Sequence, residues 1–414
     1  MRTQRERATA MKKFVITGIQ MRNKGSQAMF LSLYYTLRSL YPDCEVVGFA
    51  NKYDHPEQYT FNMLPYDDYT RRVFKYHLNK ILPLESLLTY SVGLWKKSDK
   101  WNGKVPAMEK ALREADAIFD ASGYTLGSGW SKQAGELLLQ TIRIARSYNK
   151  KIILMPQSFG PFDWADEDNS EFLARIKDEL EYCLKIYARE KEGYDCLTSL
   201  GLTNVALSQD MVIREKIFPT ADDIHTSLAA KPFDLPPEDS VGFIINQNVF
   251  RIGDPNAVLD LYAKILDRLI DNGENVYIIN TSTADTNLVN GVLGKVCKPE
   301  RIKIISGEHS SPTLIEIISR FKYVVASRYH SVVFAYRSGV PAVILGWASK
   351  YTDLAEHFEQ QDYVVDIRDP DTSRIFQQID RMSAEHANES IRIKGALESI
   401  QTSSVVREAV SILA

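Results

Sequence analysis

Short runs of apolar residues alternate with stretches of helical periodicity along most of the chain. This alternation is typical of a parallel β-sheet whose strands are joined by crossover helices. The first half contains runs at 14–17, 45–49, 117–120, 152–155, 186–188 and 205–207. The second half contains runs at 241–245, 276–279, 302–305, 323–326, 342–345 and 363–366. Each set is long enough to form its own doubly wound sheet.

The pattern divides the chain into two α/β lobes. A segment rich in Pro and Asp at 218–239 predicts a linker. We therefore expect an N-terminal Rossmann-like lobe over 13–225 and a C-terminal Rossmann-like lobe over 226–384. Apolar residues at helical spacing predict a closing helix over 385–414, and the polar start predicts a disordered extension over 1–12. Two such lobes facing a cleft are similar to the GT-B-like arrangement of two-lobed glycosyltransferases.

Residues 52–101 fit no α/β unit and mix apolar, aromatic and basic side chains. One hypothesis is that this insertion touches a membrane surface. The simpler interpretation is a helical insertion that packs on the first lobe, or a contact between two copies of the chain.

Composition and charge narrow the classes of function. The length of 414 residues exceeds what one hydrophobic core usually serves, which agrees with two domains. A formal net charge of -3 provides no overall basic field for nucleic acid, so an anionic ligand needs a local cationic site. No apolar run is long enough for a transmembrane helix, and the start lacks the apolar segment of a secretory signal. Four scattered cysteines without a CxxC pair indicate reduced thiols. We expect a cytoplasmic protein, with peripheral attachment to the inner face of the membrane as an alternative.

Ligands of doubly wound sheets bind beyond the carboxyl ends of the strands, so the residues after each strand are the first candidates. After the first strand, Asn23, Gly25 and Ser26 open a helix whose N-terminus favours an anion, although a plain turn is the alternative. This turn is neither GxGxxG nor a Walker loop. After the third strand, Gly123 and Tyr124 lie in a loop of glycines, hydroxyls and aromatics that suits a sugar, unless it is merely flexible.

Polar groups also follow the next three strands. We expect residues 156–162 to form a rigid turn that carries Gln157 and Ser158. Arg189 ends the fifth strand, where it can bind a carboxylate or phosphate in a bidentate way. The structural alternative is a salt bridge from Arg189 to Glu190 or to Asp210.

The most informative stretch is 326–346. A buried strand leads to Arg328, Tyr329, His330 and Ser331 at the opening of a helix, which Gly339 ends before the next strand. Arg328 and His330 therefore add a permanent cation and a titratable group where backbone N–H groups already favour an anion. A lone histidine is more often structural, but this position beside an arginine favours function.

These residues resemble a known family. The sequence 327–331, followed by Ala335, 338–341 and 350–351, is similar to the C-terminal signature of the polysaccharide pyruvyl transferase family. The segments 23–25, 122–129, 156–161 and 189–190 match its N-terminal landmarks in order, and the resemblance covers roughly 13 to 350. Ser26, Gly123-Tyr124 and Tyr329 depart from the usual pattern, which bears on acceptor recognition more than on donor binding.

The resemblance implies transfer of a pyruvyl group from phosphoenolpyruvate to a sugar of a cell-surface polysaccharide or its precursor, forming a ketal and releasing phosphate. It implies a donor site of Arg189, Arg328, Tyr329, His330 and Ser331, with His330 and Arg328 catalytic. The acceptor or cleft candidates are Asn23, Gly25, Ser26, Gly123, Tyr124, Gln157, Ser158 and Asp210. We expect no metal, because the other histidines show no ligand spacing, and no cofactor besides the co-substrate. The expected partners are phosphoenolpyruvate and a sugar, free or lipid-linked, without nucleic acid, and the oligomeric state stays open.

Two alternatives remain at this point. A nucleotide-sugar glycosyltransferase of the same architecture would need a carboxylate for the ribose in the second lobe. The helix after Pro341 offers no clear Glu for this role, although Glu356 and Glu359 are not far off. A non-catalytic relative that only binds glycan would have no reason to keep Arg189, Arg328 and His330 together.

Overall fold

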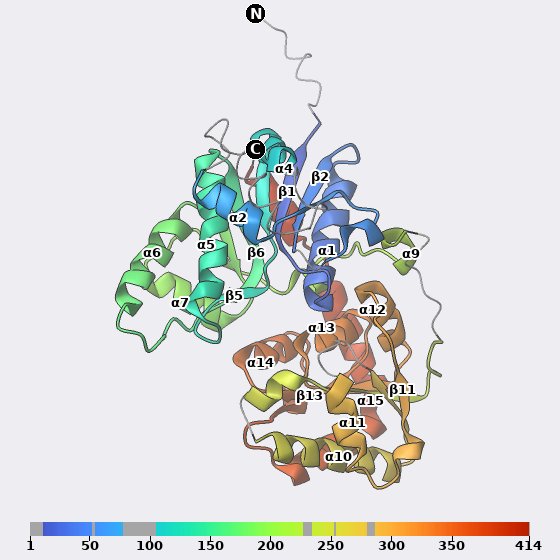
Figure 1. The fold of residues 1–414 in the computed structure, drawn as a ribbon. Helices are drawn as coiled ribbons and strands as arrows, with labels where there is room; N and C mark the ends of the chain where they lie inside the picture. Colours follow the sequence, from blue (N-terminus) through green and yellow to red (C-terminus); the bar gives the residue numbers. More distant parts are fainter. Residues whose placement is uncertain are drawn as a thin grey trace, which may run out of the picture.

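A computed structural model describes residues 11–51, 54–77, 105–226, 234–251, 254–279 and 286–413. These residues form two α/β lobes, each built around its own parallel sheet (Figure 1). Residues 1–10 of the expected extension, and residues 52–53 and 78–101 of the insertion, lie outside the described residues.

The N-terminal sheet has the strand order β3-β2-β1-β4-β6-β7-β8, with β5 paired to β6. Its strands are β1 (Lys13–Ile19), β2 (Glu45–Ala50), β3 (Met63–Pro65), β4 (Ala117–Asp120), β5 (Tyr124–Leu126), β6 (Lys151–Phe159), β7 (Lys185–Ala188) and β8 (Val205–Leu207). All six predicted strands are confirmed. The expected turn at 156–162 is wrong in its first half, because β6 continues through Gln157 and Ser158, and the chain turns only at Gly160, where φ is +71°.

Helices cover both faces of this sheet (Figure 1). They are α1 (Lys24–Leu40), α2 (Asp68–Lys75), α4 (Val105–Glu114), α5 (Lys132–Ser147), α6 (Asn169–Glu181) and α7 (Lys191–Ser199), followed by the short α8 (Met211–Arg214) and α9 (Ala221–Ile224). A 3-10 turn, η2 (Pro56–Gln58), precedes β3. One face of α1 packs into the core of the lobe, because Met29, Leu33 and Leu37 are buried.

The C-terminal sheet has the order β11-β10-β9-β12-β13-β14. Its strands are β9 (Ser240–Ile244), β10 (Asn275–Ile279), β11 (Lys303–Ile305), β12 (Tyr323–Ala326), β13 (Ala342–Gly346) and β14 (Val364–Asp366). The covering helices are α10 (Pro255–Asp271), α11 (Thr286–Leu293), α12 (Ser311–Ser319), α13 (Tyr329–Arg337) and α14 (Ser349–Glu356), with 3-10 turns η4 (Gln247–Arg251), η6 (Pro299–Arg301) and η7 (Gln361–Tyr363). This is the Rossmann order, in which the crossover direction reverses between β9 and β12. The predicted pair of Rossmann-like lobes is confirmed.

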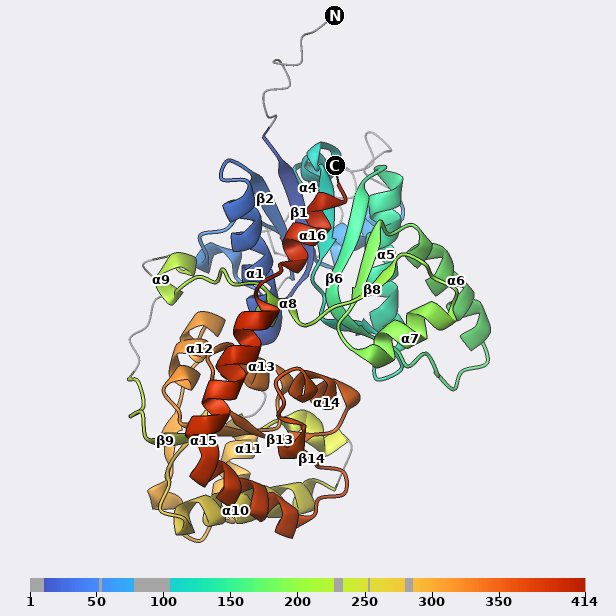
Figure 2. The same cartoon turned by 180° about the vertical axis from the view of Figure 1, so that it is seen from behind.

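The end of the chain differs from the prediction. Instead of one helix over 385–414, α15 (Thr372–Ile400) begins where the side chain of Asp371 caps it, and a second helix, α16 (Val405–Ser411), follows. Figure 2 shows α15 running along the C-terminal lobe toward the other lobe, where α16 packs on the N-terminal lobe. Glu215 accepts a hydrogen bond of 3.0 Å from the Val406 amide. The chain therefore passes between the lobes twice, once before β9 and once between α15 and α16. Both connections hold the two lobes together.

The described part of the insertion belongs to the first lobe. β3 extends the sheet beside β2, and Val73 and Phe74 of α2 are buried in the apolar cluster that includes α5. Residues 54–77 thus pack on the first lobe, as the simpler interpretation of the insertion expects. Among the residues that the structure describes, no helix combines the length and apolar character needed to cross a bilayer.

Candidate active site between the lobes

A cleft of about 640 Å³ opens between the two lobes. From the N-terminal lobe it is lined by residues that follow β1, β4 and β7, and from the C-terminal lobe by residues that follow β9, β12 and β13. Since the strands of each sheet are parallel, the carboxyl ends of both sheets meet at this cleft. The site therefore lies where the sequence argument expects ligands.

Ten of the predicted site residues line this cleft: Asn23, Gly25, Ser26, Gly123, Tyr124, Arg189, Arg328, Tyr329, His330 and Ser331. The other three do not. Ser158 lines an adjoining cavity, whereas Gln157 and Asp210 are buried beneath the surface of the cleft. Gln157 is fully buried, with its side-chain nitrogen 3.3 Å from the carboxylate of Asp120.

The polar side chains of the turn before α1 form hydrogen bonds within the turn and with the start of the helix. The side chain of Asn23 caps the helix by accepting hydrogen bonds from the amides of Gly25 (3.1 Å) and Ser26 (3.3 Å). The hydroxyl of Ser26 accepts one of 3.0 Å from the amide of Gln20. Asn23 and Ser26 therefore shape this wall of the cleft.

The helix α13 begins inside the cleft. Arg328 occupies its N-cap position with an extended backbone (φ -107°, ψ 121°), and no side chain caps this helix end. The positive end of the helix dipole therefore points toward the cleft, beside the guanidinium of Arg328 and the imidazole of His330. Gly339 follows the helix with φ +72° and, as predicted, ends it.

His330 is held by the opposite lobe. Its Nε2 lies 3.5 Å from Oδ2 of Asp210, which is fully buried. Burial alone raises the pKa of Asp210, but the nearby imidazole of His330 and the charge of Arg189 hold it down at about 2. Burial lowers the pKa of His330, against the opposing attraction of Asp210. The imidazole is therefore neutral near pH 7, in the form that accepts a proton.

Arg189 forms the salt bridges that the sequence analysis gave as the alternative to ligand binding. Its Nε donates to Glu190 (3.0 Å), its Nη1 to Asp210 (3.0 Å) and its Nη2 to the hydroxyl of Ser158 (2.6 Å). The guanidinium also stacks 4.5 Å from the ring centroid of Tyr329. Arg189 still lines the cleft, but two buried carboxylates already balance its charge.

The site also contains residues to which the sequence argument gave no role in binding or catalysis. Lys350, at the start of α14, lies among aromatic rings from both lobes, and burial lowers its pKa to about 8. Lys24 reaches across the cleft to Glu308 over 2.9 Å. The rule used for the other strands would have found Trp347 and Lys350, since both directly follow β13.

A second cavity of about 590 Å³ adjoins the first. The two share one group of wall residues: Tyr124, Trp130, Asn248, Trp347 and Lys350. The second cavity has Ser158, Glu190 and Glu192 on its N-terminal side. It combines aromatic faces with hydroxyls and carboxylates, a combination that suits a sugar.

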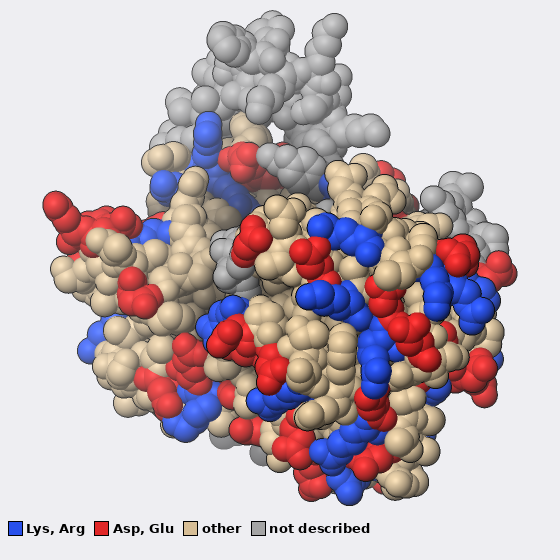
Figure 3. All heavy atoms as spheres, turned by 90° about the horizontal axis from the view of Figure 1, so that it is seen from below, with Lys and Arg blue, Asp and Glu red and all other residues tan. Residues whose placement is uncertain are grey.

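The charges of the first cavity contrast with those of the whole chain. Among the described residues that line it, five are Lys or Arg (Arg22, Lys24, Arg189, Arg328 and Lys350) and one is acidic, Asp54. Asp54 is buried and accepts hydrogen bonds from the amides of Met21 and Asn51, both at 2.7 Å. On the face seen from below, by contrast, basic and acidic side chains are interspersed (Figure 3). The excess of cationic side chains in this cavity therefore contrasts with the mixed charges of that face.

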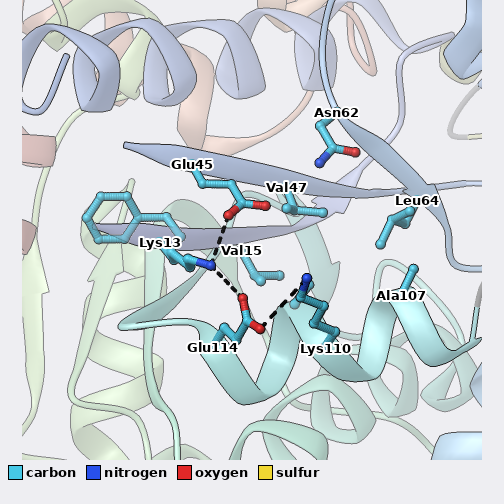
Figure 4. Close-up of a pocket in the computed structure, with 11 residues that line it drawn as sticks. Lys13, Val15, Glu45, Val47, Asn62, Leu64, Ala107, Lys110 and Glu114 are labelled. Carbon is cyan, nitrogen blue, oxygen red and sulfur yellow. Dashed lines mark hydrogen bonds and ion pairs between the residues drawn. The ribbon is translucent and has the colours of Figure 1, made fainter. Parts of the chain in front are cut away.

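A smaller cavity of about 200 Å³ lies at the other end of the N-terminal sheet (Figure 4). Its charged groups pair with one another, since Lys13 binds both Glu45 and Glu114. It lies at the amino ends of β1 and β2, away from every candidate residue. No group of three His, Cys, Asp or Glu side chains within the described residues is placed to hold a metal ion.

Solved structures with a similar arrangement include UDP-GlcNAc 2-epimerases and a trehalose-6-phosphate synthase. The UDP-GlcNAc 2-epimerase from Neisseria meningitidis bound to UDP-GlcNAc superposes with a TM-score of 0.55 at 10% identity, covering 97% of this chain and 99% of that one. A trehalose-6-phosphate synthase superposes with a TM-score of 0.55 at 11% identity, again covering 97% and 99%. The epimerase from Methanocaldococcus jannaschii reaches 0.53 at 10% identity, covering 89% and 92%. At such identities the likeness shows the GT-B fold alone.

Sequence comparison is more specific. No curated protein matches the chain. The family model described as polysaccharide pyruvyl transferase matches residues 23–349, which include both walls of the cleft. The resemblance seen in the residues around Arg328 and His330 is thereby confirmed, and the chain belongs to the polysaccharide pyruvyl transferase family.

Proposed function

We propose that the chain transfers a pyruvyl group from phosphoenolpyruvate to a sugar of a cell-surface polysaccharide or its precursor. The observation that carries this proposal is the meeting of Arg328 and His330 at the open N-terminus of α13, in a cleft whose described charged residues are cationic with one exception, Asp54. Phosphoenolpyruvate carries a phosphate and a carboxylate on a three-carbon frame. Clustered cations and a helix N-terminus supply the complementary charge.

The chemistry needs proton transfer at two places. One hydroxyl proton of the sugar ends on C3 of the donor as the C2=C3 double bond becomes a single bond, and the other leaves with the phosphate. Both hydroxyl oxygens become bonded to C2, whose bond to the phosphate oxygen breaks. His330 suits the removal of a hydroxyl proton, because its lowered pKa keeps it neutral at pH 7. Asp210 then stabilises the imidazolium that forms, since its carboxylate lies 3.5 Å from Nε2.

The acceptor fits the second cavity. Trp130 and Trp347 line this cavity with aromatic side chains, and Ser158 and Glu190 line it with polar ones. A sugar in this cavity reaches the donor past Tyr124, which lines both spaces. We therefore assign the donor to the cationic cavity and the acceptor to the aromatic one.

The geometry gives less support to a nucleotide-sugar glycosyltransferase. Glu356 and Glu359, the carboxylates that the sequence offered for a ribose, are exposed and neither lines the cleft. A purely glycan-binding protein would not need a cationic cavity beside the aromatic one.

Phosphate release tests the proposal. The purified chain is incubated with phosphoenolpyruvate and a panel of free and lipid-linked sugars, beside an Arg328→Ala variant. We expect phosphate release that depends on one acceptor and falls at least 100-fold in the variant, about 3 kcal/mol of transition-state stabilisation. The absence of release with every acceptor, or release that Arg328→Ala leaves undiminished, would count against the proposal.

A further inference from the structure

The carbonyl oxygen of Ser327 is held by two side chains that come from different parts of the C-terminal lobe. Ser327 is fully buried between the end of β12 and Arg328, the N-cap residue of α13. Its carbonyl accepts a hydrogen bond of 3.0 Å from Nδ2 of Asn246 and one of 2.9 Å from the hydroxyl of Tyr351. A carbonyl oxygen has two lone pairs, so these two donors satisfy it completely.

The other polar groups of Ser327 are bonded as well. Its amide donates to the carbonyl of Ile244 over 3.0 Å, and its hydroxyl donates to the same carbonyl over 3.2 Å. The hydroxyl also accepts a hydrogen bond of 2.8 Å from Tyr262 of α10. The partners of this one residue therefore come from β9, from the segment that follows β9, from α10 and from α14.

The peptide group that contains this carbonyl leads directly into Arg328. Because a peptide group is planar, a carbonyl that is held in place also fixes the direction of the amide on its other side. This amide belongs to Arg328, which has an extended backbone and lines the cationic cavity. The two bonds to Ser327 therefore restrict the direction in which the side chain of Arg328 leaves the backbone.

Tyr351 is suited to hold this carbonyl. Burial raises its pKa, so the hydroxyl stays protonated and donates at neutral pH. Its ring packs edge-on against the ring of Tyr329, with 5.8 Å between the centroids, which fixes the place of the hydroxyl. Tyr351 also lines the cationic cavity, but its hydroxyl is bound to Ser327.

We propose that Asn246 and Tyr351 are positioning residues, which act on the reaction through Arg328 by holding the carbonyl of Ser327. This inference rests on the proposed function and adds two residues to the same site. An arginine binds an anion through N–H groups in fixed directions, so its contribution depends on orientation as well as on charge. Loss of one bond to the carbonyl should therefore weaken donor binding in addition to lowering stability.

A double-mutant cycle on donor affinity tests this role. Titration calorimetry of the full chain with phosphoenolpyruvate compares wild type, Tyr351→Phe, Arg328→Ala and the double variant. Where Arg328 is present, Tyr351→Phe should weaken binding about 3- to 10-fold, and in the Arg328→Ala background it should change binding less than about twofold. The loss of thermal stability caused by Tyr351→Phe should be the same in both backgrounds, because the carbonyl loses a bond in each.

Tyr336→Phe is the matched control. Tyr336 is fully buried in α13 itself, and its hydroxyl has no hydrogen-bond partner within the part of the chain that the structure describes. Removal of that hydroxyl should leave donor affinity as in wild type. Asn246→Ala removes the other bond to the carbonyl of Ser327 and should repeat the pattern of Tyr351→Phe, so it decides the question if Tyr351→Phe does not fold.

Two results overturn the inference. Wild-type affinity in Tyr351→Phe means that the carbonyl does not position Arg328, and a loss that persists in full without Arg328 means that Tyr351 contacts the donor itself. If Arg328→Ala binds too weakly to measure, Arg328→Lys is the second background, because a flexible ammonium group depends less on the direction of its backbone.

Failure of this inference is distinguishable from failure of the proposed function. If either overturning result is found while the wild type still releases phosphate, the proposed function stands and only the positioning role fails. A wild-type protein that neither binds phosphoenolpyruvate nor releases phosphate overturns the proposed function itself.

Discussion

The imidazole of His330 packs directly against Gly25 of the opposite lobe. A β-carbon built on Gly25 would lie 2.1 Å from Nδ1 of His330 and 2.3 Å from Cγ. Gly25 does not have a positive φ, so its backbone conformation does not require a glycine. A glycine is needed at this position because any side chain would clash with the ring of His330. The N-terminus of α1 and the N-terminus of α13 thus meet through one histidine and one glycine.

Gly25→Ala should therefore impair catalysis. The added methyl group forces the His330 ring away from its place beside Asp210. We expect kcat to fall at least tenfold, because a small misplacement of a catalytic group is enough for such losses. Steady-state phosphate release measures the effect.

Gly395→Ala is the matched control. Gly395 lies in α15, and a β-carbon there meets nothing within 4 Å. This variant should keep full activity and gain up to about 1 kcal/mol of stability from helix propensity. Equal activity of the two variants would show that the Gly25–His330 contact has no part in the reaction.

Asp210→Asn should lower the free energy of unfolding at neutral pH and make it less dependent on pH. The pKa of Asp210 is about 2 in the folded protein, against 3.8 for an unperturbed carboxyl group. A lowered folded-state pKa stabilises the protein above pH 4, and this stabilisation is lost as the pH falls toward 2. The variant should therefore unfold about 2 kcal/mol more easily at pH 7, and this difference should vanish near pH 2.

Urea unfolding across pH 2–7 measures this difference. Asp195→Asn is the control, because Asp195 forms only an exposed pair with Lys191 and should change stability by less than about 0.5 kcal/mol. A difference between wild type and Asp210→Asn that persists unchanged at pH 2 would mean that the carboxylate charge is not what stabilises the Arg189–Asp210–His330 cluster.

Trp130→Ala should separate the two substrates. Trp130 is 40% exposed and lines both cavities, while the hydrogen bond from Trp164 goes to its backbone carbonyl and survives the substitution. We expect KM for the sugar to rise about tenfold, near 1.4 kcal/mol, with KM for phosphoenolpyruvate unchanged. Tyr76→Ala, which removes an exposed ring outside both cavities, is the control. A rise in the donor KM alone would place the donor, and not the sugar, against Trp130.

Much of the fold could be predicted because apolar strands of a doubly wound protein stand out from amphipathic helices. The strand at 117–120 and the one at 323–326 coincide with β4 and β12. The short strands β3 and β5 were missed, since three residues at a sheet edge or inside a glycine loop carry too little pattern. The start of α15 is readable in the sequence, because Ile375, Ile379 and Met382 recur at helical spacing and are buried, so the predicted start at 385 is simply too late.

The parts of the site that could be predicted are those whose residues are close together in the sequence as well as in the fold. Arg328 and His330 follow one strand, so their common position was readable. The balance of charge at Arg189 depends on Ser158, Glu190 and Asp210, which come from the ends of three different strands and meet only in the folded lobe. The aromatic rings around Lys350 include that of Tyr124 from the other lobe, and no local sequence pattern indicates such a contact.

The central claim is that this cleft moves the pyruvyl group itself, and carbon-labelled phosphoenolpyruvate tests it most directly. After incubation with the acceptor identified by phosphate release, label in the sugar and free phosphate are both measured. The account predicts label in an acid-labile product, one phosphate per label, and neither in Arg328→Ala. Phosphate without label in the sugar, or modification of the sugar that requires a nucleotide sugar in place of phosphoenolpyruvate, would contradict it.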